Sequence, residues 1–260
     1  MNSCIALIGG ETFTEGFKEV HIRLLDLARS IRANPDDQPV RVVYLVTCAS
    51  HDGAERVDYL RERAENNLGK MGIEVSTPRV IDRQSANDPE YARVVSEADW
   101  IYFSGGHPHV GMRILKGSLV LEAILAAFKR GLLISGSSAG AMILCSHSVV
   151  ITPEMNAEIG KIIQRGEGHS DWLIPFPPLE KCLGLVKRSM CWPHMNIVFS
   201  ANWVRSLLPH GQRFIGIDEQ TAVVKDTTGR WHVWGKGSVV VGTHEALHVY
   251  PSGRGIQSLD

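Results

Sequence analysis

The sequence has 260 residues, of which 44% are hydrophobic and 21% are charged, and its formal net charge is −1. A chain of this length and composition can bury a sizeable core, and we expect a single domain over residues 1–260. A net charge near zero, without basic runs interleaved with aromatic residues, excludes nucleic acid as an expected partner.

Strand-like and helix-like segments alternate through the first half of the chain. Strands are predicted over residues 5–8, 40–46, 73–80, 98–103 and 132–135, and helices over 17–31, 53–71 and 119–130. Pro78 makes the third of these strands a poor central strand. Apolar strands separated by helices build a parallel sheet that is covered on both faces. The sequence therefore predicts an α/β fold, a three-layer sandwich with a mostly parallel central sheet.

The last third of the chain has a different pattern. Residues 147–193 are rich in Gly, Pro and charge, and we expect long loops with one or two short helices there, which leaves open whether they form a lid. A helix is predicted over 196–208. Strand-like runs follow at 214–217, 221–224, 231–234 and 238–241, and the turns at 226–229 and 235–237 predict antiparallel hairpins.

Targeting signals and redox motifs are not evident in the sequence. The first ten residues lack a basic region and a long apolar run, and no segment approaches the roughly 20 apolar residues of a membrane helix. The five cysteines are an odd number and form no C-x-x-C pair, so we expect reduced thiols. These features predict a cytoplasmic protein without a membrane partner.

Ser138 is the strongest candidate for a functional residue. It is the centre of a G-x-S-x-G pentapeptide between Gly136 and Gly140, with an apolar strand before it and a small, apolar helix start after it. Strand, tight turn and helix are the context of a nucleophile elbow, whereas glycines that only pack a strand against a helix are the structural alternative. At such an elbow the amide of Ala139 is available to stabilise an oxyanion.

Glycine pairs follow two other predicted strands, at Gly9-Gly10 and Gly105-Gly106. All three glycine-rich turns should lie at the same edge of a parallel sheet, where active sites form. Gly105-Gly106 is the natural source of the second oxyanion donor, because glycine lets a backbone approach a substrate closely. Gly9-Gly10 lacks the G-x-G-x-x-G pattern of a dinucleotide site, so we expect no such cofactor.

A serine nucleophile needs a histidine base and an acid that orients it. His107, His109, His169 and His194 all remain candidates for the base, whereas His147 is expected to point away from Ser138. If the acid falls between nucleophile and histidine in the chain, carboxylates of the 154–171 region are favoured over those at 218 and 219. The former set comprises Glu154, Glu158, Glu167 and Asp171 and the latter Asp218 and Glu219. His107-x-His109 has no further ligand at metal-binding spacing, and we expect no metal.

Several segments together resemble the cyanophycinase and aspartyl dipeptidase (dipeptidase E-like) family of serine peptidases. They are 5–10, the strand and Gly-Gly turn of 102–106, the elbow of 136–141, 183–185 with 192–195, and 216–224. The resemblance implies the class I glutamine amidotransferase-like, flavodoxin-like sandwich.

The same resemblance implies roles for individual residues. Ser138 would be the nucleophile, His194 the base, and the amides of Gly106 and Ala139 the oxyanion hole. The family's acid follows the serine by a short interval, which favours Glu154, with Glu158 as the alternative.

Three residues beside these motifs are expected to contact substrate: His107, Pro108 and Trp192. They differ from the family pattern, which carries Asn or Asp after Gly-Gly and Asp-Gln before the catalytic histidine. The expected function is serine-type hydrolysis of a peptide or isopeptide bond, of the aspartyl-linked type, without metal or organic cofactor. An amidase or acyltransferase acting on a small amide or ester and a non-catalytic binding protein are the alternatives, and a homodimer is a candidate assembly.

Overall fold

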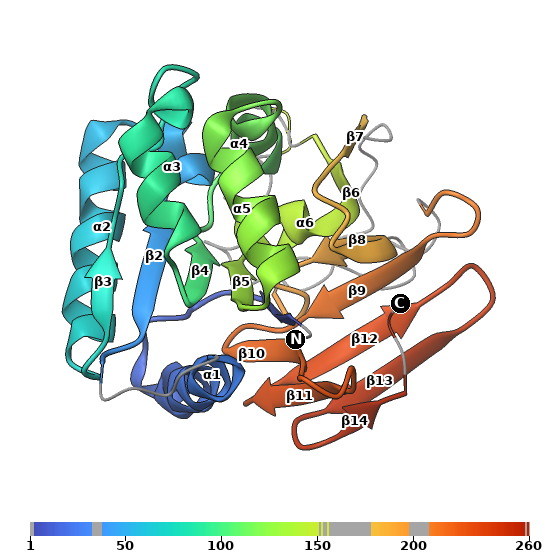
Figure 1. Ribbon diagram of the computed structural model, residues 1–260. Coiled ribbons are helices and arrows are strands. Elements are labelled where there is room, and N and C mark those ends of the chain that lie inside the picture. Colours follow the sequence, from blue (N-terminus) through green and yellow to red (C-terminus); the bar gives the residue numbers. More distant parts are fainter. Residues whose placement is uncertain are drawn as a thin grey trace.

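Eight strands of the described chain form a first sheet with a parallel centre. The structure is a computed structural model that describes residues 3–32, 38–150, 152, 155, 178–197, 208–257 and 259. The strand order is β14-β11-β10-β1-β5-β4-β2-β3 (Figure 1). The parallel strands are β1 (Cys4–Ile8), β2 (Arg41–Leu45), β3 (Glu74–Ser76), β4 (Trp100–Phe103) and β5 (Leu133–Ser137). The antiparallel strands are β10 (Thr221–Lys225), β11 (Trp231–Gly235) and β14 (Gly255–Ile256).

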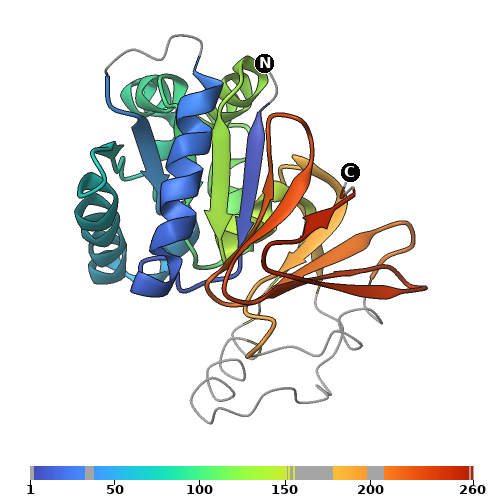
Figure 2. The same ribbon diagram turned by 90° about the horizontal axis from the view of Figure 1, so that it is seen from below.

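Helices cover both faces of this sheet (Figure 2), which confirms the predicted α/β sandwich. The helices α1 (Lys18–Ile31) and α2 (Ala54–Gly69) share a core with Cys4, Ala6 and Ile8 of β1. On the opposite face, Ile5 and Leu7 of β1 share a core with a second set of helices. These are α3 (Pro89–Ser96), α4 (Pro108–Leu115), α5 (Leu119–Arg130) and α6 (Ala139–Leu144). Short 3₁₀ turns lie at η1 (Glu15–Phe17), η2 (Thr47–Asp52) and η3 (Ser85–Asn87).

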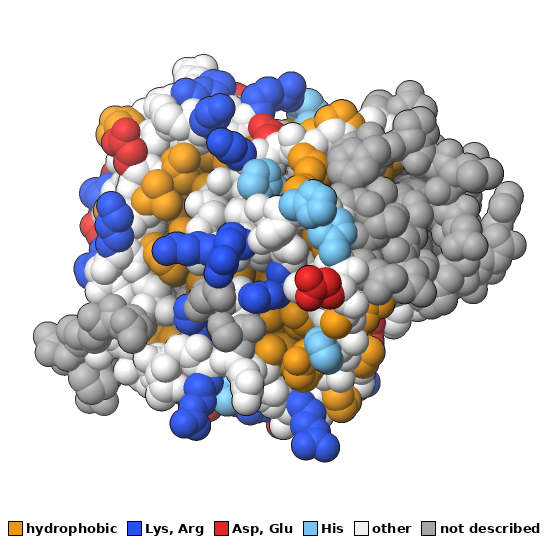
Figure 3. Space-filling model, turned by 90° about the vertical axis from the view of Figure 1, so that its right-hand side faces the viewer, with side chains coloured by type: hydrophobic (Ala, Val, Ile, Leu, Met, Phe, Trp, Pro, Cys, Tyr) orange, Lys and Arg blue, Asp and Glu red, His pale blue; other side chains and the backbone are white. Residues whose placement is uncertain are grey.

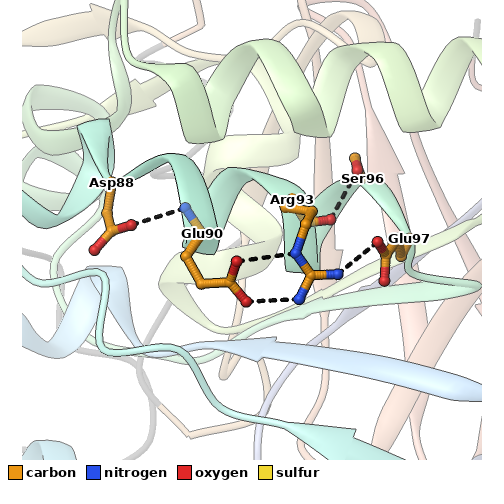
Figure 4. A network of polar contacts seen from close by, with 5 residues as sticks. All are labelled: Asp88, Glu90, Arg93, Ser96 and Glu97. Carbon is orange, nitrogen blue, oxygen red and sulfur yellow. Dashed lines mark hydrogen bonds and ion pairs between the residues drawn. The ribbon is translucent and has the colours of Figure 1, made fainter.

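The short helix α3 shows how local sequence sets an element's ends. Asp88 caps its first turn by accepting a 2.8 Å hydrogen bond from the amide of Glu90, and Pro89 occupies the first helical position. On its outer face Arg93 binds both oxygens of Glu90 and also reaches Glu97 (Figure 4). Because these groups are exposed, the network contributes little to stability, and α3 depends on its packing against α5.

A second sheet follows the elbow helix α6 and corrects one expectation. Its order is β13-β12-β9-β8-β6-β7, and it lies beside the first sheet (Figure 1). Its strands are β6 (Cys145–Val149), β7 (Leu179–Lys181), β8 (Val186–Trp192), β9 (Arg213–Ile217), β12 (Ser238–Gly242) and β13 (Leu247–Pro251). The described parts of 147–193 therefore include strands where loops and short helices were predicted. The sequence pattern does not predict strand β8, because two exposed charged residues precede four buried residues and the strand lacks alternation of apolar and polar positions.

The C-terminal turns join the two sheets as well as closing hairpins. The pair β10–β11 is an antiparallel hairpin across the turn at 226–229, as predicted, and β12–β13 is a second hairpin that was not predicted. The turn at 235–237 is different, because β11 belongs to the first sheet and β12 to the second. The chain likewise changes sheet between β9 and β10. The residues at 218–220 thus lie in the passage between the sheets, beside the end of β1, as the hydrogen bond from the Gln220 amide to the Gly10 carbonyl shows.

The β10–β11 turn yields a test of stability against pH. Burial alone would raise the pKa of Asp226, but hydrogen bonds from Thr228, His232 and Arg230 outweigh it and lower the pKa to about 2. A carboxylate with a lowered pKa in the folded state stabilises the protein above its ordinary pKa and loses that effect as the pH falls toward 2. We expect Asp226→Ala to lower the Tm by about 2–4 °C at neutral pH and by progressively less below pH 4. Thermal melts from pH 7 to pH 2 measure this, and a difference independent of pH would contradict it.

Further predictions concern the strand with Pro78, the helix over 196–208, the cysteines and membrane helices. The strand with Pro78 is an edge strand that ends at Ser76, as its proline suggested. Most of the predicted helix over 196–208 falls outside the described residues. The cysteines are free thiols, and all except Cys182 are buried. Among the described residues, no helix combines the length and apolar character required to cross a bilayer.

Candidate functional site

Ser138 lies at a sharp turn between β5 and α6. Its backbone has φ 53° and ψ −119°, a conformation that non-glycine residues rarely adopt and that concentrates at functional sites. The flanking glycines allow the turn, because a Cβ on Gly136 would lie 2.2 Å from the Gly140 carbonyl carbon. A Cβ on Gly140 would lie 2.5 Å from the Phe103 carbonyl oxygen. The glycines therefore pack the strand against the helix and also leave Ser138 half-buried at the turn, where it lines the cavity described below.

Two backbone amides near Ser138 are available to a ligand. The Ser138 amide itself donates to the Ile8 carbonyl, and the His107 amide donates to the Cys48 carbonyl. Within the described part of the chain, the amides of Gly106 and Ala139 have no hydrogen-bond acceptor. A Cβ on Gly105 would lie 3.2 Å from the Ser138 Cβ, so the Gly105-Gly106 segment passes directly beside the serine.

His194 contacts the hydroxyl of Ser138. Its Nε2 lies 2.9 Å from the Ser138 Oγ. The histidine follows β8 in a turn that is fixed to β9, because the Met195 amide donates to the Ile217 carbonyl. His194 has φ 57°, which adds a second strained residue to the site.

Glu219 binds the other nitrogen of His194. The distance from its Oε1 to the His194 Nδ1 is 2.5 Å, and its side chain is only 14% exposed. The Glu219 amide donates a 2.9 Å bond to Oδ1 of Asn196, which ties the β9–β10 turn to the histidine turn. The neighbouring Asp218 points the other way and accepts a 2.8 Å bond from the Ser238 amide. Burial raises the pKa of Asp218, partly offset by that bond.

The carboxylate on His194 differs from the one expected. Glu154 and its alternative Glu158 lie outside the described residues, as do Glu167 and Asp171. The Nδ1 of His194 is occupied by Glu219, which follows the histidine in the chain. The expectation relied on the order serine, acid, histidine. It did not take into account that the passage between the two sheets brings residues 218–220 next to the histidine. His147 lies on β6, beyond the end of the elbow helix.

The Gly9-Gly10 turn makes room for this pair. A Cβ on Gly10 would lie 2.3 Å from the Glu219 Oε2 and 2.5 Å from the His194 Cε1. A Cβ on Gly9 would lie 2.1 Å from the Asp218 carbonyl oxygen. The two glycines therefore let the acid and the base approach the end of β1, a role that the sequence pattern alone did not reveal.

A cavity of about 350 Å³ opens on Ser138 and His194. Its far wall is a stripe on α2, where Arg56, Leu60 and Arg63 follow one another at helical spacing. The Arg63 guanidinium donates to the Phe13 carbonyl at 3.0 Å. Neither arginine forms an ion pair with a carboxylate of the described chain. The remaining lining residues are Gly10, Glu11, Thr12, Phe13, Tyr44, Asp52, Gly105, Gly106, Ser137 and Glu219.

The three residues expected to contact substrate do not line this cavity. Trp192 is 2% exposed because it ends the buried half of β8, and Pro108 is buried in the first turn of α4. The His107 ring turns to Asp52, whose Oδ1 lies 2.9 Å from its Nε2. Asp52 rather than His107 reaches the cavity. The α2 stripe was missed because its contact with the site arises only from the packing of α2 on the sheet.

A second cavity of about 310 Å³ lies on the second sheet. It is lined by Arg188, His210, Gly211, Gln212, Arg213, Thr243, His244 and Glu245. Figure 3 shows the side of the molecule that lies at the right in Figure 1, and Lys, Arg and His side chains gather on it. Its lining residues include no serine or cysteine beside a histidine, whereas the first cavity has Ser138 beside His194. In the described ranges, no three His, Cys, Asp or Glu residues are grouped to hold a metal ion.

Comparisons with known proteins identify a family and similar folds. The model of peptidase family S51 matches residues 5–229. A solved peptidase from an acI-B1 Actinobacterium is 22% identical, with a TM-score of 0.80 over 99% of this chain and 97% of that one. A candidate peptidase E from Listeria monocytogenes EGD-e is 18% identical, with a TM-score of 0.55 over 91% of this chain and 98% of that one. A comparison with curated protein sequences finds no match. At these identities, the two structures bear on the fold alone.

Proposed function

This chain belongs to peptidase family S51 and is a serine peptidase, and we propose that it cleaves its substrate through Ser138, His194 and Glu219. The observation that carries the proposal is the continuous contact from the Ser138 Oγ to His194 and on to the Glu219 carboxylate. Nucleophile, base and orienting acid in this relation are the working parts of serine hydrolysis on unrelated folds. The strained backbone of Ser138 and His194, at the end of a parallel sheet, agrees with a site for chemistry.

The reaction follows from the two faces of the imidazole. Nε2 of His194 takes the proton from the Ser138 Oγ as that oxygen attacks the amide carbonyl. Nδ1–H donates to Glu219, which fixes the tautomer and stabilises the imidazolium. The imidazolium then protonates the leaving amine, and a water molecule hydrolyses the acyl-serine by the same steps in reverse order.

The negative charge of the tetrahedral intermediate needs donors that are already in place. The amides of Gly106 and Ala139 supply them, because both lie beside Ser138 and have no acceptor in the described structure. Ala139 also begins α6, whose N-terminal end favours negative charge. Such preorganised donors contribute on the order of 3–4 kcal/mol of transition-state stabilisation each.

Two arginines of the cavity, which is also lined by the carboxylates of Glu11 and Asp52, favour a short peptide with a carboxylate near the scissile bond. Arg56 and Arg63 face the space in front of Ser138 without a carboxylate partner in the described chain. A guanidinium binds a carboxylate through paired hydrogen bonds, which gives it orientation as well as charge. A space of about 350 Å³ holds a few residues at most. These features agree with the aspartyl-type substrate that the sequence resemblance implies.

Neutralising Arg63 tests this substrate class. We expect Arg63→Gln to lower kcat/KM for an aspartyl dipeptide about 100-fold, mainly through KM, because a charge-assisted hydrogen bond is lost. The asparaginyl analogue should change less than about threefold. Arg61→Gln is the matched control, because Arg61 on the same helix binds Asp58 and the Thr77 carbonyl instead of the cavity. Equal losses with both dipeptides would exclude Arg63 as a carboxylate ligand.

Covalent labelling tests the proposed chemistry itself. A fluorophosphonate should modify the folded protein at Ser138, and peptide mapping by mass spectrometry would locate the adduct. Hydrolysis in the presence of an added amine then distinguishes a peptidase from an acyltransferase, since a transferase would divert the acyl group to the amine. Absence of label at Ser138 in the folded protein would refute the proposed nucleophile.

A further inference from the structure

His107 and Asp52 form a half-buried bridge beside the serine. The distance from Nε2 of His107 to Oδ1 of Asp52 is 2.9 Å, and the two side chains are 21% and 29% exposed. The bridge joins two elements far apart in the sequence, the turn after β4 and the end of η2. A charge-assisted bond in such a place is worth more than an exposed ion pair, because solvent screens it less.

The segment held by this bridge is the one that carries the Gly106 amide. Gly106 precedes His107 and has φ 133°, and a Cβ on it would lie 2.3 Å from the Cys48 carbonyl oxygen. The His107 amide donates to that same carbonyl at 2.7 Å. The loop is therefore fastened to η2 at two points, by the backbone at Cys48 and by a side chain at Asp52.

Three other basic residues lie near this bridge: His51, His109 and Arg113. Among this cluster, His107 is the basic residue whose ring contacts Asp52. On η2, the Nε2 of His51 lies 2.8 Å from Nη2 of Arg113, and because arginine only donates, that nitrogen accepts. His109 on α4 has a lowered pKa through burial, with further lowering by His107, Arg113 and His51. The hydrogen bond to Asp52 raises the pKa of His107. The next charged residue toward the cavity is Arg56 at the start of α2.

We propose that His107 is a positioning residue for the hydrolysis: its bridge to Asp52 holds the Gly105-Gly106 segment so that the Gly106 amide faces the oxyanion formed at Ser138. The inference rests on the proposed function, since it assigns the support of that same oxyanion hole. It also explains why His107 lies beside the cavity without lining it. The bridge keeps the Asp52 carboxylate occupied as well, so that it does not compete with substrate for Arg56.

The test separates positioning from simple structural support. We expect His107→Ala to lower kcat about 10- to 100-fold on an aspartyl dipeptide while KM changes less than about threefold, because a displaced oxyanion donor affects the transition state. Affinity for the corresponding peptide aldehyde, whose adduct places an oxygen in the hole, should fall in parallel. His107→Gln, which carries a neutral donor near the position of Nε2, should restore most of kcat. His51→Gln is the matched control and should keep kcat within about twofold of the parent, since His51 binds Arg113 outside the bridge.

A pH profile adds a readout that a merely structural residue would not change. A histidine with a raised pKa keeps its charge to a higher pH than an ordinary imidazole, so the charged bridge weakens only on the alkaline side of the usual histidine range. We expect kcat of the parent to step down by about threefold there, and His107→Gln to lack this step. Unchanged kcat in His107→Ala, or a His107→Gln variant that retains the step, would overturn the proposal. Loss of activity in Ser138→Ala alongside an unaffected His107→Ala would refute only the positioning role, whereas an active Ser138→Ala would refute the proposed function.

Discussion

Replacing Ser138 with alanine should lower kcat for peptide hydrolysis by about 10⁴- to 10⁶-fold. The Oγ is the only atom that the proposed mechanism uses to attack the carbonyl, and His194 has no other hydroxyl partner in the described structure. The residual rate would come from the oxyanion amides and from substrate binding, which remain in the variant. The measurement is kcat and KM on an aspartyl dipeptide, together with fluorophosphonate labelling, which should disappear.

Ser135 provides a control on the same strand. Its hydroxyl accepts a 2.7 Å bond from Nε1 of the buried Trp100, and Ser135 does not line the cavity. Ser135→Ala should therefore cost about 1–2 kcal/mol of stability by leaving that indole unpaired, and should keep its activity. Ser138→Ala should show the opposite pair of effects, with stability near that of the parent. A Ser138→Ala enzyme that retains its hydrolytic rate would exclude this serine as the nucleophile.

The parts of the fold that sequence predicts best are those set by local patterns. The parallel strands of the first sheet are continuous apolar runs because helices cover both faces, and their glycine-rich ends mark one edge of the sheet. The elbow at Ser138 could be predicted for the same reason, since strand, glycines and helix start are adjacent in the chain. His194 came from a resemblance of short motifs rather than from any periodicity.

The parts that were missed depend on contacts between distant segments. Glu219 meets His194 because the chain passes from the second sheet to the first just after β9, and no local pattern indicates that passage. The α2 stripe of Arg56, Leu60 and Arg63 lines the cavity because of the way α2 packs on the sheet. In the sequence, these residues cannot be told apart from the exposed face of an ordinary charged helix. The bridge between Asp52 and His107 likewise spans 55 positions.

Glu219 is the residue whose replacement should have the next largest effect. We expect Glu219→Gln to lower kcat about 10³- to 10⁴-fold with little change in KM, because the neutral amide cannot stabilise the imidazolium and can hold the wrong tautomer. Its side chain is largely buried, and its Oε1 contacts the His194 Nδ1 directly at 2.5 Å. Kinetics at several pH values would measure the loss and show whether a more basic medium restores any of it.

Replacements of two other carboxylates make this prediction specific. Asp218→Asn changes the adjacent residue, whose Oδ2 accepts from the Ser238 amide, and an asparagine oxygen can still accept that bond. Its kcat should therefore stay within about threefold of the parent. Glu154→Gln tests the acid that chain order favoured, and it too should leave kcat near the parent value. If instead Glu154→Gln abolished turnover while Glu219→Gln preserved it, the order serine, acid, histidine would hold and Glu219 would serve only to anchor the imidazole. Loss in Glu219→Gln alone would place the acid after the histidine, on the turn where the two sheets meet.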